Sequence, residues 1–419
     1  MIRIINLKLL LIIGISLLGA NCYSQSSGCT DPQAKNFNPA ATVNDGSCGY
    51  PNTDSNPPFL YTLSNKLSEN STLVYLNKKL WTINDSGGLP VLYALDTASG
   101  QIVQEVTVTN AINVDWEELA IDEDYMYIGD IGNNIGNRND LGIYKILIDD
   151  LPISGNGTVT STHITYVYPD QKNSGIRISH NFDCEAFITA DDSLYLFSKN
   201  REDQQTKLYR LPKQPGDYVA DLITSFNVNG LITGADYNAT DNEIVLVGYS
   251  QNFFTPFVWL LFDFESNNFF SGNKRRIDFP NLTTIQTEGI CYLERKNLMI
   301  SAERSPTFEA RVFGFNTSSL TDHVSLTDKM KVAMRASIKV TENPVSDSTL
   351  KILLIDAPKA NYRMDITDLQ GNIVYQSSLT TDRMDEQSYI VKLPPLSDGM
   401  YLISLISSSR IISETFVIQ

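Results

Sequence analysis

The sequence predicts an all-β fold, with a β-propeller of five blades (six as the alternative) followed by a small immunoglobulin-like β-sandwich. Strand-forming residues recur throughout the chain, and long amphipathic helical patterns are absent. Between residues 58 and 325, a pattern of strand, turn and strand recurs roughly every fifty residues, which is typical of propeller blades. Near the carboxyl end, short runs of alternating apolar and polar residues are separated by turn sequences, which is typical of a sandwich.

Residues 1–24 have the pattern of a secretory signal peptide. Arg3 and Lys8 precede an apolar run from Leu9 to Leu18, which is too short for a membrane span. Cys22 raises a lipoprotein alternative, but Asn21 stands where such a signal requires a small residue. No later stretch is long and apolar enough to span a membrane, so we expect no transmembrane segment in the mature chain.

Residues 25–50 form a cysteine-bracketed segment. In an exported protein, Cys29 and Cys48 are expected to form a disulfide, because so short a segment cannot bury a core of its own. Its Cys-Thr-Asp-Pro and Asp-Gly-Ser-Cys strings resemble a small repeat of secreted and surface bacterial proteins. Asp31 and Asp45 are candidate Ca²⁺ ligands, or they simply form turns. The Asn- and Pro-rich residues 51–57 are predicted to be a linker.

Five repeating units make up the predicted propeller, residues 58–325. Each begins with an apolar strand, and the aligned first positions are Ser71, Glu117, Glu185, Thr233 and Glu288. A third strand follows in every unit and a fourth in the first four, so the segment from Pro58 to Leu63 is expected to supply the fourth strand of the last unit and close the ring. The long second unit is expected to contain a loop at Asn133 to Asp140; an additional blade there would give six.

Three strings in these units resemble a family of exported bacterial propellers. They are Asn84-Asp85-Ser86-Gly87-Gly88, Asp115-Trp116-Glu117-Glu118-Leu119-Ala120 and Gly129-Asp130-Ile131-Gly132-Asn133-Asn134. The resemblance covers most of the predicted propeller. It implies the fold and no particular activity. Calcium-dependent phytases and related esterase-like proteins are loosely similar propellers.

The candidate site lies at one mouth of the propeller channel. First strands line such a channel, so Glu117, Glu185 and Glu288 should converge there, as catalytic or metal-binding carboxylates. Further candidate ligand-binding residues lie at the adjoining strand ends: Asn84, Asp85, Asp115, Asp130, His180, Lys199 and Arg304.

Three interpretations of this acidic mouth remain open. The carboxylates could pair with Lys199 or Arg304 and hold the blades in register, or hard oxygen ligands could bind Ca²⁺. Alternatively, two carboxylates could act as acid and base in a glycosidase, or a metal could assist a phosphoesterase. With three histidines and neither a Gly-x-Ser-x-Gly nor a His-Glu-x-x-His motif, the usual serine hydrolases and zinc proteases are disfavoured.

Other features limit the partners. The net charge of −16 argues against nucleic acid. Aromatic residues around Phe253 and Trp259 mostly suit packing between blades, and a few on loops could contact an extracellular glycan or protein ligand. Cys184 and Cys291 lie in apolar strands and are expected to be buried free thiols.

Residues 338–419, after a predicted linker at 326–337, resemble the C-terminal sorting domain of the bacterial type IX secretion system. The matching strings are Asn343-Pro344, Asp365 to Gly371, Gly399-Met400-Tyr401-Leu402 and Phe416-Val417-Ile418. Gln419 departs from the Lys or Arg with which such domains often end. The resemblance implies export through the periplasm by the type IX secretion machinery, and a protein that is secreted or held at the outer cell surface.

Overall fold

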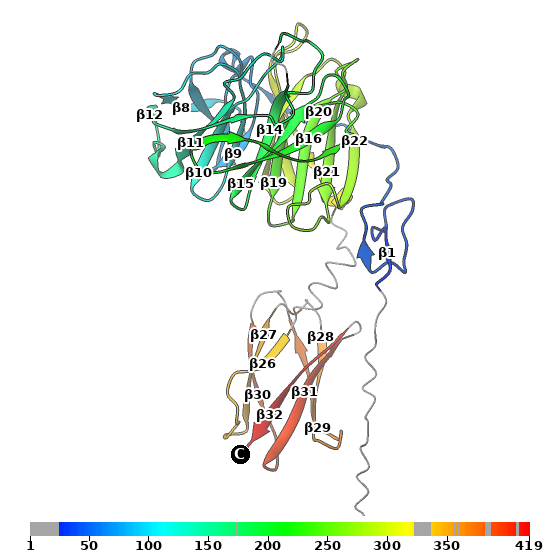
Figure 1. The fold of residues 1–419 in the computed structure, drawn as a ribbon. Coiled ribbons are helices and arrows are strands. Elements are labelled where there is room, and N and C mark those ends of the chain that lie inside the picture. The colour runs from blue at the N-terminus through cyan, green and yellow to red at the C-terminus, as the bar shows by residue number, and fades with distance from the viewer. Residues whose placement is uncertain are drawn as a thin grey trace, which may run out of the picture.

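The computed structural model describes residues 25–419, except 173–174, 322–336, 356, 358–360, 382–386 and 408–409. The predicted signal peptide at 1–24 and most of the predicted linker at 326–337 lie outside the described residues. Figure 1 shows the strands of two all-β parts, one of residues 58–321 and one of residues 337–419. Within the described chain, no helix is long and apolar enough to cross a membrane.

The first part contains five sheets, each with four antiparallel strands. Sheet 1 consists of β5 (Val74–Leu76), β6 (Lys79–Thr82), β7 (Val91–Asp96) and β8 (Ile102–Val108). Sheet 2 consists of β9 (Trp116–Ile121), β10 (Tyr125–Asp130), β11 (Gly142–Leu147) and β13 (Thr162–Val167). Sheet 3 consists of β14 (Asp183–Ala190), β15 (Ser193–Lys199), β16 (Thr206–Pro212) and β18 (Asp221–Phe226).

Sheet 4 consists of β19 (Leu231–Asn238), β20 (Glu243–Tyr249), β21 (Pro256–Phe262) and β22 (Asn273–Asp278). Sheet 5 consists of β23 (Thr287–Glu294), β24 (Asn297–Ala302), β25 (Arg311–Asn316) and β4 (Phe59–Thr62). The few helical turns are η1 (Asn65–Leu67), η2 (Ile148–Asp150), η3 (Pro280–Leu282) and α1 (Ser318–Thr321). The strand-rich composition thus forms an all-β structure.

The first strands of the five sheets surround a common centre. β9 contacts β5 and β14, β19 contacts β14 and β23, and β23 contacts β5, so neighbouring first strands form a complete ring. β4, from the N-terminal side, pairs antiparallel with β25, as the predicted closure of the ring requires. Because β4 comes from the start of residues 58–321 and β25 from the end, their pairing in sheet 5 closes the ring without a covalent bond.

Three short strands, which the sequence patterns did not predict, extend the outer edges of sheets. β12 (Gly157–Val159), β17 (Gly216–Val219) and β3 (Thr53–Asp54) pair parallel with β8, β13 and β22. β3 lies within the segment that we expected to be only a linker. The unpaired backbone groups of an outer strand explain these additions, because any extended segment that passes close by can bond to them.

Apolar side chains fill the spaces between neighbouring sheets. The cluster between sheets 1 and 2 includes Trp81, Leu92, Trp116 and Ile128, all buried. Between sheets 3 and 4, the buried residues include several aromatic side chains of the fourth unit, among them Phe257 and Phe269. Most aromatics of that unit therefore pack between sheets, while Phe253 on the β20–β21 loop is exposed.

The second part is a two-layer sandwich. One layer contains β26 (Ser337–Val340), β27 (Thr349–Ile355) and β30 (Gln387–Lys392), and the other contains β28 (Asn361–Thr367), β29 (Ile373–Thr380), β31 (Gly399–Ser407) and β32 (Arg410–Ile418). Inward side chains of both layers, such as Leu350, Ile366 and Phe416, form one apolar core. The alternating pattern predicted from the sequence produces this single buried face on each layer.

The cysteine-bracketed segment contains the short parallel pair β1 (Ser27–Gly28) and β2 (Val43–Asn44). Cys29 and Cys48 form a disulfide, as predicted. The segment packs against sheet 4, where the Tyr50 ring lies 6.1 Å from that of Phe262 and the Arg275 guanidinium lies 5.2 Å from the Tyr50 ring. In sheets 3 and 5, Cys184 and Cys291 are buried free thiols, also as predicted.

Candidate functional site

A β-bulge lies at the aligned position of four first strands. The pairing register shifts where Glu117, Glu185, Thr233 and Glu288 occur, so these residues have no partner residue on the second strand. An extra residue of this kind bends the strand and redirects its side chain. Three of the four carry carboxylates, and all three of these line one cavity near the centre of the ring.

This channel cavity has a volume of about 310 Å³. It opens where first strands begin and second strands end. Its lining residues are Asn70, Ser71, Asp85, Glu117, Asn134, Glu185, Lys199, Arg201, Tyr249, Phe254, Gln286, Glu288 and Glu303. Of the residues that the spacing of the units singled out, Asp85, Glu117, Glu185, Lys199 and Glu288 line this cavity.

Two carboxylates near the cavity are neutralised by basic side chains. Lys199 Nζ forms an ion pair with Glu185 Oε2, and both side chains are buried. Although burial opposes it, the Glu185 charge raises the pKa of Lys199 well above its usual value, so the ammonium stays charged. Arg201 Nη2 lies 3.0 Å from Asp183 Oδ2. Glu185 and Asp183 are thus already paired.

Other carboxylates in the cavity have no such partner. Glu117 and Glu288 are only 5% and 7% exposed, and no described residue donates a hydrogen bond to either carboxylate. Burial is the main cause that raises the pKa of both carboxyl groups well above the ordinary range, and the neighbouring charge of Glu185 also raises it. A buried carboxylate without a donor is costly unless it is protonated or bound to a cation.

Asp115, which is not a lining residue of the cavity, lies beside Glu117. Its Oδ1 is buried and has no hydrogen-bond partner among the described residues. Gly132 lies against both carboxylates, since a Cβ at this position would collide with Asp115 Oδ2 and Glu117 Oε1. Burial, with Asp183 and Glu185 nearby, raises the pKa of Asp115 to about 7. The second glycine of the Gly-Asp-Ile-Gly string, Gly132, therefore leaves room for the carboxylates of Asp115 and Glu117.

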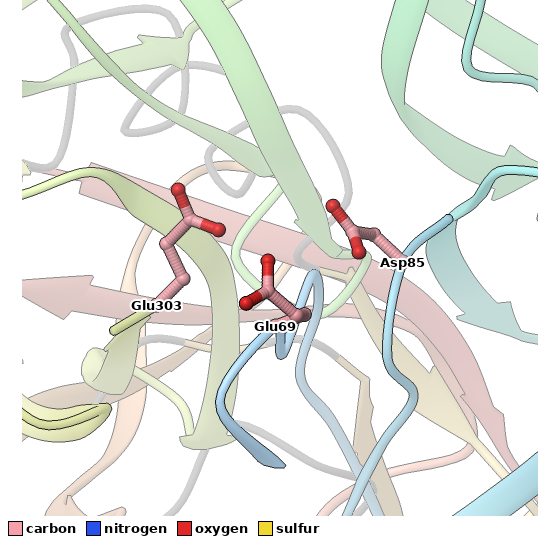
Figure 2. A group of neighbouring side chains, drawn as sticks. All are labelled: Glu69, Asp85 and Glu303. Carbon is pink, nitrogen blue, oxygen red and sulfur yellow. The ribbon is translucent and has the colours of Figure 1, made fainter. Parts of the chain in front are cut away.

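Three more carboxylates meet at the mouth of the cavity. Figure 2 shows Glu69, Asp85 and Glu303 pointing toward one another from three separate chain segments, and one oxygen of each lies within 4.8 Å of the other two. Burial and then the neighbouring acids raise the pKa of Asp85 to about 7 and that of Glu303 to about 8. We refer to these three residues as the mouth triad.

These raised pKa values predict a stability that falls as pH rises. The folded protein holds protons that the unfolded chain releases near pH 4, so folding is favoured at low pH and this contribution is lost as pH rises toward 8. In the absence of divalent cations, we expect Tm to fall between pH 5 and pH 8. The measurement is a series of thermal melts in EDTA.

The variant Glu303→Gln should flatten this pH profile, since it removes one of the three charges. Asp221→Asn is the control, because Asp221 is exposed and paired with Arg210 outside the cavity. A profile that stays equally steep in Glu303→Gln would contradict the account.

Several predicted site residues lie outside the cavity lining. Asp130 pairs with Arg138 at 2.8 Å, and buried His180 accepts a hydrogen bond at Nδ1 from the Phe182 backbone N–H. Asn84 donates to the Lys66 carbonyl, and the Arg304 side chain is exposed. These four residues organise the surrounding loops or face solvent, so the geometry gives them no direct place in the cavity.

Asp31 and Asp45 lie in the cysteine-bracketed segment. Asp31 accepts hydrogen bonds from the Gln33 backbone N–H at Oδ1 and from the Tyr50 hydroxyl at Oδ2. Asp45 accepts one from the Ser47 backbone N–H at Oδ1. These hydrogen bonds are typical of aspartates that form turns, which agrees with the turn-forming alternative to Ca²⁺ binding.

Gln286 and Arg201 line the cavity, and Glu69 lies beside Asp85 and Glu303, but none of the three was predicted as a site residue. Glu69 and Gln286 precede the aligned positions Ser71 and Glu288 by two residues, as Asp115 precedes Glu117. Extending the comparison of units by two positions would have found both. Arg201 lies two residues after the end of β15, where the fifth unit has Arg304 after β24 but the other three units have no arginine.

The sequence comparisons concern the second part of the chain. Residues 343–419 match the family described as "Secretion system C-terminal sorting domain". This match indicates export to the outer cell surface or secretion, and an interaction with the type IX secretion machinery. It covers the sandwich except β26 and leaves the five sheets without a family. No curated protein matches the chain.

Solved structures with a similar arrangement share little sequence with this chain. PorZ, a surface component of the type IX secretion system of Porphyromonas gingivalis, is 10% identical with a TM-score of 0.30; the match covers 84% of this chain and 45% of PorZ. An exo-β-1,3-galactanase of Phanerochaete chrysosporium is 10% identical with a TM-score of 0.37, covering 88% of this chain and all of the galactanase. The chain thus spans less than half of PorZ, and such similarity assigns no activity.

Proposed function

We propose that this protein is a secreted or surface-held binding module, built on a five-bladed β-propeller and an immunoglobulin-like sorting domain, that binds Ca²⁺ in the channel cavity. The five four-stranded sheets and their ring of first strands support five blades over six. Among the described residues, the carboxylates of the cavity that have no basic partner carry the calcium proposal; Glu303, one of them, accepts a hydrogen bond from the Gln286 amide. They are oxygen ligands of the kind that Ca²⁺ prefers, and Ca²⁺ accepts six to eight of them in flexible geometry.

The mouth triad is the proposed centre of the site. Its three oxygens lie within 4.8 Å of one another, and Asn70, next to Glu69, is fully buried with an Oδ1 that has no hydrogen-bond partner among the described residues. A cation there would lower the repulsion that raises the pKa values of Asp85 and Glu303. Glu288 also lines the cavity and offers a further carboxylate ligand.

Exposed apolar side chains around the mouth support a binding role. They lie on loops that connect strands at the same end of the ring, where the second strands terminate. The exposed residues are Leu89, Ile112, Val114, Ile135, Ile176, Ile178, Phe253, Phe254 and Phe308. Apolar side chains gathered on one face of a soluble protein are typical of interaction surfaces. An extracellular protein or glycan is the ligand class that this face would meet.

The calcium proposal is tested by thermal melts of metal-free protein with increasing Ca²⁺. Binding to the folded state alone should stabilise it by about 2.7 kcal/mol when Ca²⁺ reaches a hundredfold excess over Kd. The double variant Asp85→Asn, Glu303→Gln should lose this response, while Asp31→Asn, in the cysteine-bracketed segment, should keep it. An unchanged response in the double variant would contradict the proposal.

The hydrolase alternative uses the same carboxylates. Glu185 is engaged by Lys199, whereas Glu117 and Glu288 are buried, unpaired and have raised pKa values, which is the condition expected of a general acid. If Glu117 and Glu288 were catalytic, the variants Glu117→Gln and Glu288→Gln would abolish turnover of a glycoside or phosphoester while ligand binding survived. Structural or cation-binding carboxylates would instead alter stability.

A further inference from the structure

A second cavity, of about 570 Å³, lies at the opposite strand ends from the carboxylate cavity. For example, Glu117 near the start of β9 lines the carboxylate cavity, whereas Ile121 at the end of the same strand lines the second cavity. Turns of sheets 2, 3 and 4 surround it, and Lys213, which follows β16, adds to its wall. It is separate from the mouth triad, because the two cavities share no lining residue.

A buried ammonium group faces this cavity. Lys145, on β11, is only 8% exposed, and its Nζ donates a hydrogen bond to the Lys213 carbonyl at 3.0 Å. The same Nζ lies 3.7 Å from the centre of the Tyr125 ring. Among the described residues, no other acceptor bonds to it. An ammonium group has three donors, so this one retains hydrogen-bonding capacity toward the cavity.

The neighbouring Asp122 does not supply the missing acceptor. Its Oδ2 pairs with Lys213 Nζ at 2.9 Å and accepts a hydrogen bond from the Tyr127 hydroxyl at 2.9 Å. Its Oδ1 accepts from the Tyr125 backbone N–H. Both carboxylate oxygens are thus engaged, and Lys145 is left for a ligand.

The walls and rim of the cavity add aromatic and acidic groups. Tyr125 and Tyr237 line it, and the exposed carboxylates of Glu123, Asp124 and Asp192 stand at its edge. Tyrosine rings offer flat apolar surface, and the carboxylates accept hydrogen bonds. The cavity therefore combines a buried donor, aromatic walls and several acceptors.

These groups discriminate between classes of ligand. An anion would be repelled by the five carboxylates of the lining, and a cation would leave the Lys145 ammonium without a further acceptor. A neutral ligand with many hydroxyl groups satisfies both, because each hydroxyl can accept from the ammonium and donate to a carboxylate. We propose that this cavity binds a neutral saccharide segment.

The test is isothermal titration of the purified protein with cellotriose, maltotriose and galactotriose, and with trigalacturonic acid as the charged comparison. At least one neutral trisaccharide should bind with a Kd below about 10 mM. Trigalacturonic acid should bind more weakly. Binding should persist in EDTA, which separates this site from the proposed calcium site.

Two variants locate the binding. Lys145→Met keeps the length of the side chain and should weaken binding by at least about tenfold, the effect of one charge-assisted hydrogen bond. Tyr125→Leu tests the aromatic wall independently if Lys145→Met does not fold. Lys66→Met, at an exposed lysine of η1 that pairs with Glu105, is the matched control. Absence of binding by every neutral trisaccharide, or unchanged affinity in the folded variants, would overturn the proposal.

Discussion

Replacing Glu118 with alanine should destabilise the propeller-like part by about 3–5 kcal/mol, because it leaves several buried polar groups without partners. The Glu118 side chain is 1% exposed and accepts hydrogen bonds from the backbone N–H groups of Leu119 and Ala235, each at 3.0 Å, and from the Thr72 hydroxyl. One carboxylate thus links segments of sheets 1, 2 and 4 across the centre of the ring. Urea unfolding measures the loss.

Two further variants serve as comparisons for Glu118→Ala. Glu118→Gln retains one acceptor oxygen and should cost less than Glu118→Ala. Glu105→Ala removes the exposed Lys66–Glu105 pair and should cost no more than about 1 kcal/mol. A loss in Glu118→Ala as small as that in Glu105→Ala would show that the carboxylate does not hold the ring together.

The second large effect is expected from Lys199→Met. Removing the ammonium leaves the buried Glu185 with only a longer contact, to Arg201 Nη2 at 3.9 Å. It also leaves Glu185 beside Glu117 and Glu288, which have no hydrogen-bond donor among the described residues. Breaking a buried pair on one side typically costs about 3–5 kcal/mol. The loss should be greatest at pH 8 and smaller at pH 5, because protonation of Glu185 relieves the unpaired charge. Urea unfolding at both pH values measures it.

The double variant Lys199→Met, Glu185→Gln should recover part of the stability, since no unpaired charge remains. Arg210→Met breaks an exposed pair with Asp221 and should have little effect at either pH. A Lys199→Met loss that is independent of pH and is not reduced in the double variant would exclude a charge-pairing role for Lys199.

The repeat pattern predicted the all-β architecture and the position of the acidic mouth. Glu117, Glu185 and Glu288 recur at one place in their units, and the structure brings all three into one cavity. The apolar strands that flank them have a clear period, so their burial follows from pattern alone. The outer strand from the N-terminal side was also predictable, because the last unit lacked one.

The pairings within the site could not be predicted. Nothing in the sequence distinguishes Glu185, which pairs with Lys199, from Glu117, which has no partner. The alternation of side chains along a strand could not predict the different surroundings of Glu117 and Glu118 either. The bulge at Glu117 changes which face each side chain occupies, and Glu118 accepts a hydrogen bond from Ala235 across the ring. Such contacts depend on tertiary distances between units far apart in the chain.

The most direct test of the central proposal is a crystal structure of the protein grown with Ca²⁺, with anomalous diffraction used to locate the ion. The account predicts an anomalous peak bounded by Glu69, Asp85 and Glu303, absent from the double variant Asp85→Asn, Glu303→Gln. A mouth triad without an ion in Ca²⁺-saturated crystals, or a peak at Asp31 and Asp45 instead, would contradict it.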